Sequence, residues 1–279
     1  MVSRKQNTHP LHLTTLWREV LARQLGGLQI NRLEKRSHSP TGATHISSAV
    51  ACKKRRWFAR LAIPIGNRIS RLLGVRIDVL GDSAWHAREI RMHHALYEEE
   101  IGLTASGWLV VPWIADALSV TLAAPEISWQ KKARGIQVSA KELRRLHDLA
   151  CEHGRAFSHG DAGVRNIAFD DVSGEARWFD FEIQHRPEIP ANWRHMDDLR
   201  AFVYSTLALI PEASFNGISL EIFQAYERSD SIRRLRGEVM SGRLSCEIFH
   251  LAQIQVPSAK RILMDEAVIE AASIFLAVS

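Results

Sequence analysis

The chain has 279 residues, of which 46% are hydrophobic and 24% charged, and its formal net charge is +5. This balance excludes a fibrous or broadly disordered protein, and the length suits one large domain or two lobes. The three cysteines are far apart, residues 1–13 lack the apolar segment of a signal peptide, and no stretch approaches ~20 apolar residues. We therefore expect a cytoplasmic protein without a transmembrane helix.

The N-terminal part of the chain mixes helical and strand-like patterns. Residues 14–26 predict a short amphipathic helix. Residues 28–33 and 45–50 are strand-like and are separated by residues common in turns. We expect a β-hairpin that leads into a third strand near residues 50–54.

The next segment is basic and amphipathic. Between Lys53 and Ile77 there are eight Lys or Arg residues and no acid. Residues 57–74 predict two short amphipathic pieces, interrupted at Pro64 and Gly66. Such a stretch favours anionic partners, among them phosphates, acidic glycolipid or a membrane surface, although a solvated basic run gives the same pattern.

A clearer helix is predicted from about residue 83 to residue 100, and the Gly107–Ile114 segment (GWLVVPWI) predicts a buried strand. The predicted helix has one apolar face, on which a single carboxylate also lies: Trp85, Glu89, Met92 and Leu96. A carboxylate on an apolar face is costly unless it is paired, so Glu89 should have a cation nearby, unless the helix is tilted so that Glu89 meets water.

The second half of the chain is mostly helical in pattern. Ser139 has the capping-box spacing that starts a helix, which is expected to reach about residue 153. Two short strand-like runs follow at residues 166–169 and 176–179, and the pattern is helical beyond Met196. The predicted fold is therefore α+β and two-lobed, with a small β-rich N-terminal lobe over residues 1–106, a hinge strand over 107–114 and a helical C-terminal lobe over 115–279.

The residues most suited to chemistry lie just before the first of the two short strand-like runs and just after the second. The sequence His159-Gly-Asp-Ala-Gly-Val-Arg-Asn166 is followed by Trp178-Phe-Asp-Phe-Glu182. A carboxylate in a loop can accept the proton of an attacking hydroxyl, an amide five residues later can bind Mg²⁺, and a second carboxylate can join that metal to phosphates. Asp161, Asn166 and Asp180 have the order and spacing for these three roles.

This pattern resembles the catalytic and metal-binding loops of the protein-kinase-like superfamily. The HGD and DFE forms are more similar to its small-molecule and glycan branches, which include aminoglycoside phosphotransferases, choline kinases and lipopolysaccharide core (Kdo/heptose) kinases. The resemblance implies a kinase of this fold that uses ATP and Mg²⁺. Asp161 would be its catalytic base, and Asn166 and Asp180 would be its metal ligands.

The same resemblance suggests roles for supporting residues. Glu89 would pair with the lysine that orients ATP, and strand alternation allows only one of Lys53 and Lys54 to face inward. His159 is expected to brace the loop backbone. Asp197 and Asp198, placed at the start of a helix, resemble the aspartate that anchors the catalytic loop, or are simply acids favoured by the helix dipole.

Two departures from the family keep alternatives open. No GxGxxG loop occurs near residues 34–46, and about 16 residues separate Phe181 from Asp197 without an APE motif. The leading prediction is a kinase acting on a hydroxyl of a small molecule, glycan or lipid-linked sugar, with peripheral contact to an anionic membrane or glycolipid at its inner face. The alternatives are a nucleotide-dependent pseudokinase and an atypical protein Ser/Thr kinase, whereas nucleic-acid binding is disfavoured.

Overall fold

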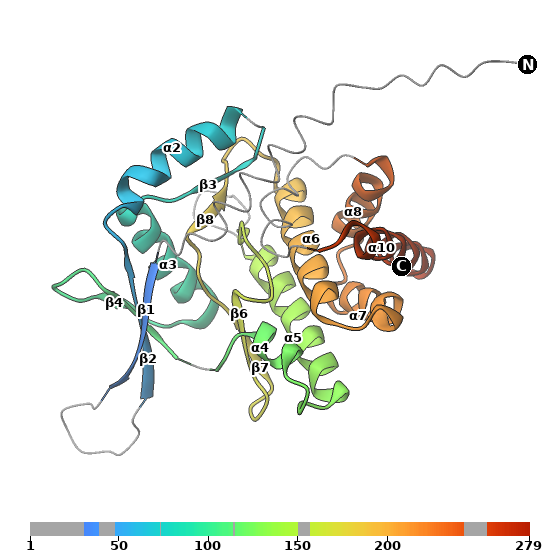
Figure 1. The fold of residues 1–279 in the computed structure, drawn as a ribbon, viewed down its shortest axis with the longest axis horizontal. Coiled ribbons are helices and arrows are strands. Elements are labelled where there is room, and N and C mark those ends of the chain that lie inside the picture. Colours follow the sequence, from blue (N-terminus) through green and yellow to red (C-terminus); the bar gives the residue numbers. More distant parts are fainter. Residues whose placement is uncertain (1–30, 39–47, 73, 114, 150–156, 243–255) are drawn as a thin grey trace, which may run out of the picture.

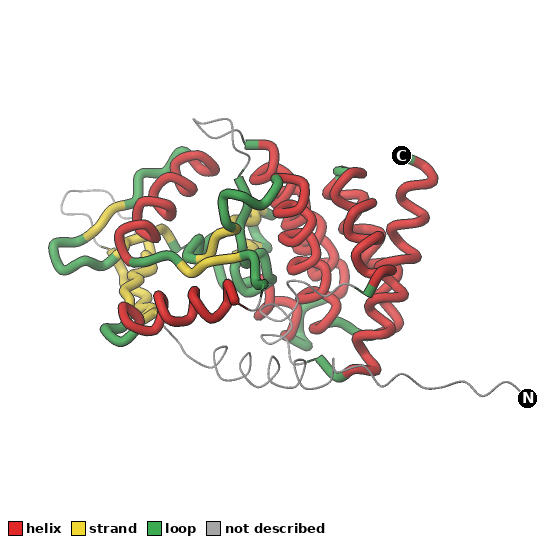
Figure 2. Tube along the Cα trace, turned by 90° about the horizontal axis from the view of Figure 1, so that it is seen from above, coloured by secondary structure: helices red, strands yellow, loops and turns green. Residues whose placement is uncertain are grey.

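The protein has a mixed α/β fold. The computed structural model describes residues 31–38, 48–72, 74–113, 115–149, 157–242 and 256–279. A small antiparallel sheet lies at one side of the molecule and a larger group of helices at the other (Figures 1 and 2). The helix predicted for residues 14–26 lies outside the described residues.

The main sheet has four antiparallel strands in the order β1-β2-β5-β4. They are β1 (Asn31–His38), β2 (Ser48–Arg55), β4 (Gly102–Leu103) and β5 (Leu109–Pro112). The predicted hairpin is present, but the separate third strand near residues 50–54 is wrong, because those residues belong to β2. The apolar run that predicted a strand over residues 107–114 contains β5, which pairs with β2 so that Leu109 lies opposite Lys53.

The basic segment forms a single helix, α2 (Ala59–Leu72), and not the two pieces that Pro64 and Gly66 had suggested. Pro64 is in the second turn, and an inward face that buries Ala59 and Ile63 keeps the helix continuous. The chain then enters β3 (Ile77–Val79).

The helix that precedes β4, α3 (Asp82–Tyr97), belongs to two hydrophobic cores at once. Trp85 packs with residues of the four-stranded sheet, whereas Met92 and Leu96 pack in the larger helical core. The helix ends before the predicted residue 100, because Glu98 takes a left-handed backbone conformation that closes the last turn. One rigid element therefore reaches from the sheet to the helical part.

The next helices are α4 (Leu118–Ala123) and α5 (Trp129–Asp148). The prediction that this helix begins at Ser139 is wrong, because Ser128 caps it eleven residues earlier by accepting the N–H of Lys131. Ser139 is buried in the middle of α5. Gly135 allows α5 to approach α4 and the following hairpin closely, since a Cβ there would lie 2.9 Å from the side chains of Leu118 and Phe169.

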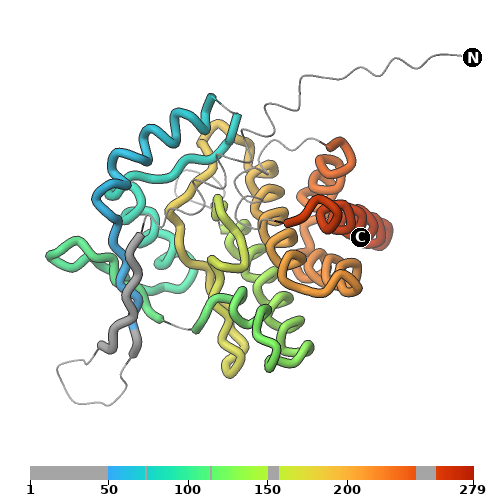
Figure 3. Tube along the Cα trace, viewed as in Figure 1, coloured from blue at the N-terminus to red at the C-terminus, as the bar shows by residue number. Residues whose placement is uncertain are grey.

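Three short strands follow α5. The hairpin of β6 (Ile167–Asp170) and β7 (Glu175–Trp178) matches the two predicted strand-like runs closely. The third, β8 (Ile183–His185), pairs with β3 although the two are far apart in sequence, and Figure 3 shows them side by side. The segment that follows Asp180 is thereby joined to the segment that leads into α3.

The regular elements described from residue 191 onward are all helical, and they complete the larger core. They are α6 (Ala191–Leu209), the 3₁₀ turn η1 (Glu212–Ser214), α7 (Phe215–Tyr226), α8 (Ser229–Ser241) and α10 (Ser258–Val278). α6 begins at Ala191, before the predicted Met196, and most of it is buried. None of the helices in the described parts of the chain is long and apolar enough to cross a membrane.

Candidate active site

Lys53 lies at the centre of a buried charged cluster. Its Nζ is 2.9 Å from Glu89 Oε1 and 3.3 Å from Asp180 Oδ1, so that β2, α3 and the segment after β7 meet at this ammonium group. Burial alone would lower the pKa of Lys53, but the charges of Asp180 and Glu89 outweigh it and raise the pKa above its usual value. Lys53 is therefore a cation at neutral pH.

Glu89 also holds the backbone next to Asp180. Its Oε2 accepts the N–H of Phe181 at 2.7 Å, and its Oε1 accepts the N–H of Asp180 at 3.3 Å. Asp180 has φ 68°, a left-handed conformation that costs a non-glycine residue about 1–3 kcal/mol. Although burial raises the pKa of Glu89, the nearby Lys53 lowers it below the usual range, so the carboxylate is ionised and can hold this strained turn.

The other candidate lysine faces away from this cluster. Lys54 Nζ donates to the backbone carbonyl of Ser106 at 2.8 Å, at the exposed turn between β4 and β5. Strand alternation allows only one of the two lysines to face inward, and in the structure that lysine is Lys53. Lys54 is not brought to the site.

Arg55 is a further cation on the inward side of β2, two residues beyond Lys53. Its guanidinium lies 3.4 Å from Asp82 and 3.5 Å from Glu182, and 4.7 Å from the centroid of the Trp85 ring. The sequence analysis did not single out this residue, although the same alternation that turns Lys53 inward applies to it.

Asp161 and Asn166 are joined within one compact loop. Asn166 Nδ2 donates to the backbone carbonyl of Asp161 at 2.7 Å and to Asp161 Oδ2 at 3.0 Å. The backbone carbonyl of Asn166 accepts the N–H of Phe179 at 3.0 Å, immediately before Asp180. The three residues with predicted catalytic or metal-binding roles are therefore on two directly bonded segments.

His159 braces this loop with both ring nitrogens. Nδ1 accepts the N–H of Asp161 at 3.3 Å, so Nε2 carries the proton, which it donates to the carbonyl of Phe179 at 3.0 Å. Burial lowers the pKa of His159, which keeps this ring neutral. Both bonds are to backbone atoms, so the ring connects the loop to the segment that carries Asp180.

Gly160 is required by a close approach of β8. Its φ is +91°, and a Cβ there would lie 2.5 Å from the carbonyl oxygen of Ile183. A side chain at this position would displace the strand and strain the backbone at once. The glycine of the HGD sequence therefore allows the loop to pack against β8.

The two aspartates of α6 are buried beneath the loop. Asp198 accepts the backbone N–H groups of His159 at 2.5 Å and of Gly160 at 2.8 Å. Asp197 accepts from His185 Nε2 at 3.0 Å, and His185 Nδ1 lies 3.1 Å from Ser158 Oγ. Both lie in the second turn of α6 and not at its start, so the helix-dipole explanation for them is wrong.

A second layer of residues holds Asp198, and the sequence analysis did not identify it. His147 of α5 donates from Nε2 to Asp198 Oδ2 at 3.0 Å, and its Nδ1 lies 2.8 Å from the hydroxyl of Tyr226. Burial alone would raise the pKa of Asp198. The hydrogen bond from His147 and the nearby histidines outweigh this effect, and the pKa lies below its usual range. These partners come from separate helices, and no local pattern connects them.

Arg88 is the most informative residue that the sequence analysis missed. Its guanidinium donates to the carbonyls of Ser158 at 2.6 Å and His159 at 3.2 Å, and to Gln184 Oε1 at 3.1 Å. Burial lowers the pKa of Arg88 to about 10, which leaves it protonated at neutral pH. A signal was available, because Arg88 follows Trp85 by three residues on the buried face of α3.

Arg88→Ala should loosen the loop that carries Asp161. Loss of a charged donor leaves buried carbonyls without their partner, at a cost of about 1.5–3 kcal/mol in the free energy of unfolding. Urea unfolding measures this cost, and hydrogen exchange should show faster exchange of the amides of residues 159–161. The matched control is Arg91→Ala, on the exposed side of the same helix. Equal unfolding energies and exchange rates for the two variants would contradict this role.

The donor set fits a magnesium ion. Asn166 uses its amide nitrogen toward Asp161, which leaves its side-chain oxygen as an acceptor, and the Asp180 carboxylate is partly exposed. Among the described residues no group of three or more His, Cys, Asp or Glu side chains could hold a metal. Two oxygen donors agree with Mg²⁺, which is usually bound through one or two protein ligands together with phosphates and water.

Comparison with known proteins finds a loose likeness to solved structures. No family model matches the chain, and no curated protein matches it. A solved structure described as WaaP in complex with acyl carrier protein is similar over 85% of this chain and 86% of that chain, with a TM-score of 0.44 and 16% sequence identity. At this level of similarity neither a fold family nor a residue role follows from the likeness.

Proposed function

We propose that this protein has a protein-kinase-like fold and transfers the γ-phosphoryl group of ATP to a hydroxyl group. The supporting observation is the buried contact of Lys53 with Glu89 and Asp180, in a cluster whose backbone is bonded to the loop of Asp161 and Asn166. Two carboxylates, an amide and a buried cation from separate segments suit phosphoryl transfer, which depends on positioning and charge neutralisation.

The roles of the chain's own residues follow from this arrangement. Asp161 orients the acceptor hydroxyl and receives its proton as the new O–P bond forms and the bond between the γ-phosphorus and the bridging oxygen breaks. Lys53 supplies a fixed positive charge for the nucleotide phosphates, and Glu89 keeps that ammonium in place. Asn166 and Asp180 would hold Mg²⁺, which neutralises phosphate charge when bound.

The proposed division of the chain is the one that the sequence predicts, with an N-terminal lobe over residues 1–106, a hinge at 107–114 and a C-terminal lobe over 115–279. β5 lies within the hinge segment, and residue 114 lies outside the described residues. The connection where a glycine-rich loop would cover the phosphates, residues 39–47, also lies outside them. The proposed acceptor is a small molecule, a glycan or a lipid-linked sugar, because β8 begins three residues after Asp180 and leaves a short segment for docking a peptide.

The test is transfer of labelled γ-phosphate from ATP to a panel of sugars, lipopolysaccharide core, choline-like alcohols and generic proteins. Transfer should require Mg²⁺ and stop when the metal is removed with EDTA. Thermal unfolding in the same preparation measures nucleotide binding, because a ligand at 100 times its Kd stabilises the folded state by about 2.7 kcal/mol. Stabilisation by Mg²⁺-ATP without transfer to any acceptor would favour a pseudokinase, and absence of both would refute the proposal.

A further inference from the structure

A row of large apolar side chains is exposed on the outer face of α2. Leu61, Ile65 and Leu72 are 69%, 62% and 82% exposed, and Trp57, just before the helix, is 80% exposed. Ile69, at 39%, extends the same row. The helical positions repeat at four, four and three residues, so they form one continuous face and not scattered surface residues. Figure 1 shows α2 at the edge of the molecule, remote from α7 and α10.

The orientation of α2 is fixed by contacts on its opposite face. Asn67 donates to the carbonyl of Val79 at 2.8 Å and accepts the N–H of Val79 at 2.9 Å, as a neighbouring strand would. Ile63 is buried on the same side. The apolar row therefore cannot turn inward without breaking these contacts.

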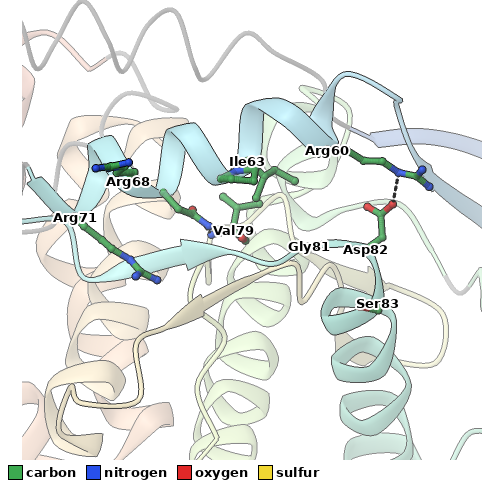
Figure 4. A pocket seen from close by; sticks show the side chains of 10 residues that line it. Arg60, Ile63, Arg68, Arg71, Val79, Gly81, Asp82 and Ser83 are labelled. Atoms are coloured by element: carbon green, nitrogen blue, oxygen red, sulfur yellow. Dashed lines mark hydrogen bonds and ion pairs between the residues drawn. The ribbon is translucent and has the colours of Figure 1, made fainter.

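Ion pairs with acids beneath the helix reinforce this orientation. Arg60 is 2.9 Å from Asp82 (Figure 4), and Arg71 is 2.6 Å from Asp78. The groove that Arg60, Arg71 and Asp82 help to line has a volume of about 800 Å³. Two of the three arginines that line it, Arg60 and Arg71, already face carboxylates, which removes most of the reason to expect an anionic ligand there.

The charge on the outer side of α2 is positive. The helix contains no acidic residue, and the acids that pair with Arg60 and Arg71 lie on its inner side. Arg56 and Arg68 are exposed and are next in sequence to Trp57 and Ile69 of this row, although Arg68 also lines the groove. A basic helix with an exposed apolar face, arginines at its borders and a tryptophan at one end has the composition of a helix that lies in the plane of a membrane interface.

Charge distinguishes a bilayer from other occupants of this face. A second copy of the chain would bring the same arginines against themselves. Residues 1–30 of this chain contain four Lys or Arg residues and one acid, so they too are basic. An anionic bilayer surface complements both the arginines and the apolar row.

We propose that the outer face of α2 docks on anionic lipid bilayers. The apolar row enters the interface, and Arg56 and Arg68 contact lipid phosphates. This surface is separate from the Lys53 cluster, and its binding requires neither nucleotide nor turnover. The proposal therefore stands or falls independently of the kinase activity.

Vesicle sedimentation tests this surface with the full-length protein. The wild type should bind vesicles of phosphatidylglycerol and phosphatidylcholine in equal parts and should not bind phosphatidylcholine alone. Arg56→Gln with Arg68→Gln should weaken binding to the anionic vesicles roughly 30-fold, and added salt should weaken it further. The triple variant Leu61→Gln, Ile65→Gln and Leu72→Gln should lose binding by at least as much.

The matched control replaces three exposed apolar residues elsewhere: Val120→Gln, Ile262→Gln and Ile274→Gln. It should bind as the wild type does, and all variants should retain the wild-type thermal unfolding midpoint, because the replaced side chains are at the surface. Equal binding by the α2 triple variant and the wild type would overturn the proposal. Absence of wild-type binding to anionic vesicles would also overturn it. If light scattering then showed a dimer that the α2 triple variant abolishes, the face would be an interface between two copies of the chain.

Discussion

Asp161→Asn should lower phosphoryl transfer by roughly 10²–10⁴-fold, the usual contribution of a positioned base. The amide cannot accept the proton of the acceptor hydroxyl, but its oxygen can still accept the hydrogen bond that Asn166 donates at 3.0 Å. The loop should therefore keep its conformation. Turnover is measured by labelled-phosphate transfer, and ATP affinity, by thermal shift, should remain nearly unchanged.

The matched control for this variant is Asp171→Asn. Asp171 follows β6 and pairs with Lys131 at the surface, where an ion pair contributes at most about 1 kcal/mol to stability. It should leave turnover unchanged. Full activity of Asp161→Asn would remove this residue from the mechanism, and a large loss of ATP affinity would show that it acts in binding.

Glu89→Gln should destabilise the protein by about 3 kcal/mol, at the lower end of the range for removing one partner of a buried ion pair. Lys53 keeps Asp180 at 3.3 Å, so its charge is not left entirely without a counterion. The amide also replaces a carboxylate that accepts the N–H of Phe181 at 2.7 Å. Urea unfolding at neutral pH measures the cost.

A double-mutant cycle separates the ion pair from the other contacts of Glu89. Lys53→Met with Glu89→Gln should cost less than the sum of the two single variants, with a coupling energy of about 0.5–3 kcal/mol. Lys54→Met is the control, since Lys54 is next along β2 but faces the exposed turn at Ser106. Its combination with Glu89→Gln should be additive. The assignment is wrong if both cycles give the same coupling.

The contribution of this pair should be insensitive to pH near neutrality. The folded-state pKa of Glu89 is lowered from its usual value of 4.5, so its contribution is present above that pH and is lost as the pH falls through the folded-state pKa. The folded-state pKa of Lys53 is raised from 10.5, so its contribution is present below that value and is lost as the pH rises through the folded-state pKa.

The sequence predicts the local parts of the site well. The spacing of Trp85, Glu89 and Met92 identified the buried face of α3, and alternation along β2 reduced the choice of lysine to one of two neighbours. These predictions worked because a side chain's direction within one helix or strand follows from its period. The roles of the residues stay predictions, since geometry alone does not measure activity.

Long-range pairings were not predictable from single segments. β3 and β8 are three residues each, and their pairing depends on how the intervening chain folds. The contact of His147 with Asp198 likewise joins two helices through one polar pair. The errors at Ser139 and Pro64 have a different cause, because local start and stop signals were overridden by a continuous buried face.

Arg88 and Glu89 are consecutive residues, so one turn of α3 holds two attachments at once. Glu89 holds Lys53 and the Asp180 turn, and Arg88 holds the backbone at residues 158 and 159. The helix cannot rotate or slide without disturbing both. A ligand that restrains α3 through Lys53 therefore also restrains the Asp161 loop, and the linkage is reciprocal. In the proposed kinase, an acceptor that orders this loop would tighten nucleotide binding by the same factor by which the nucleotide tightens acceptor binding.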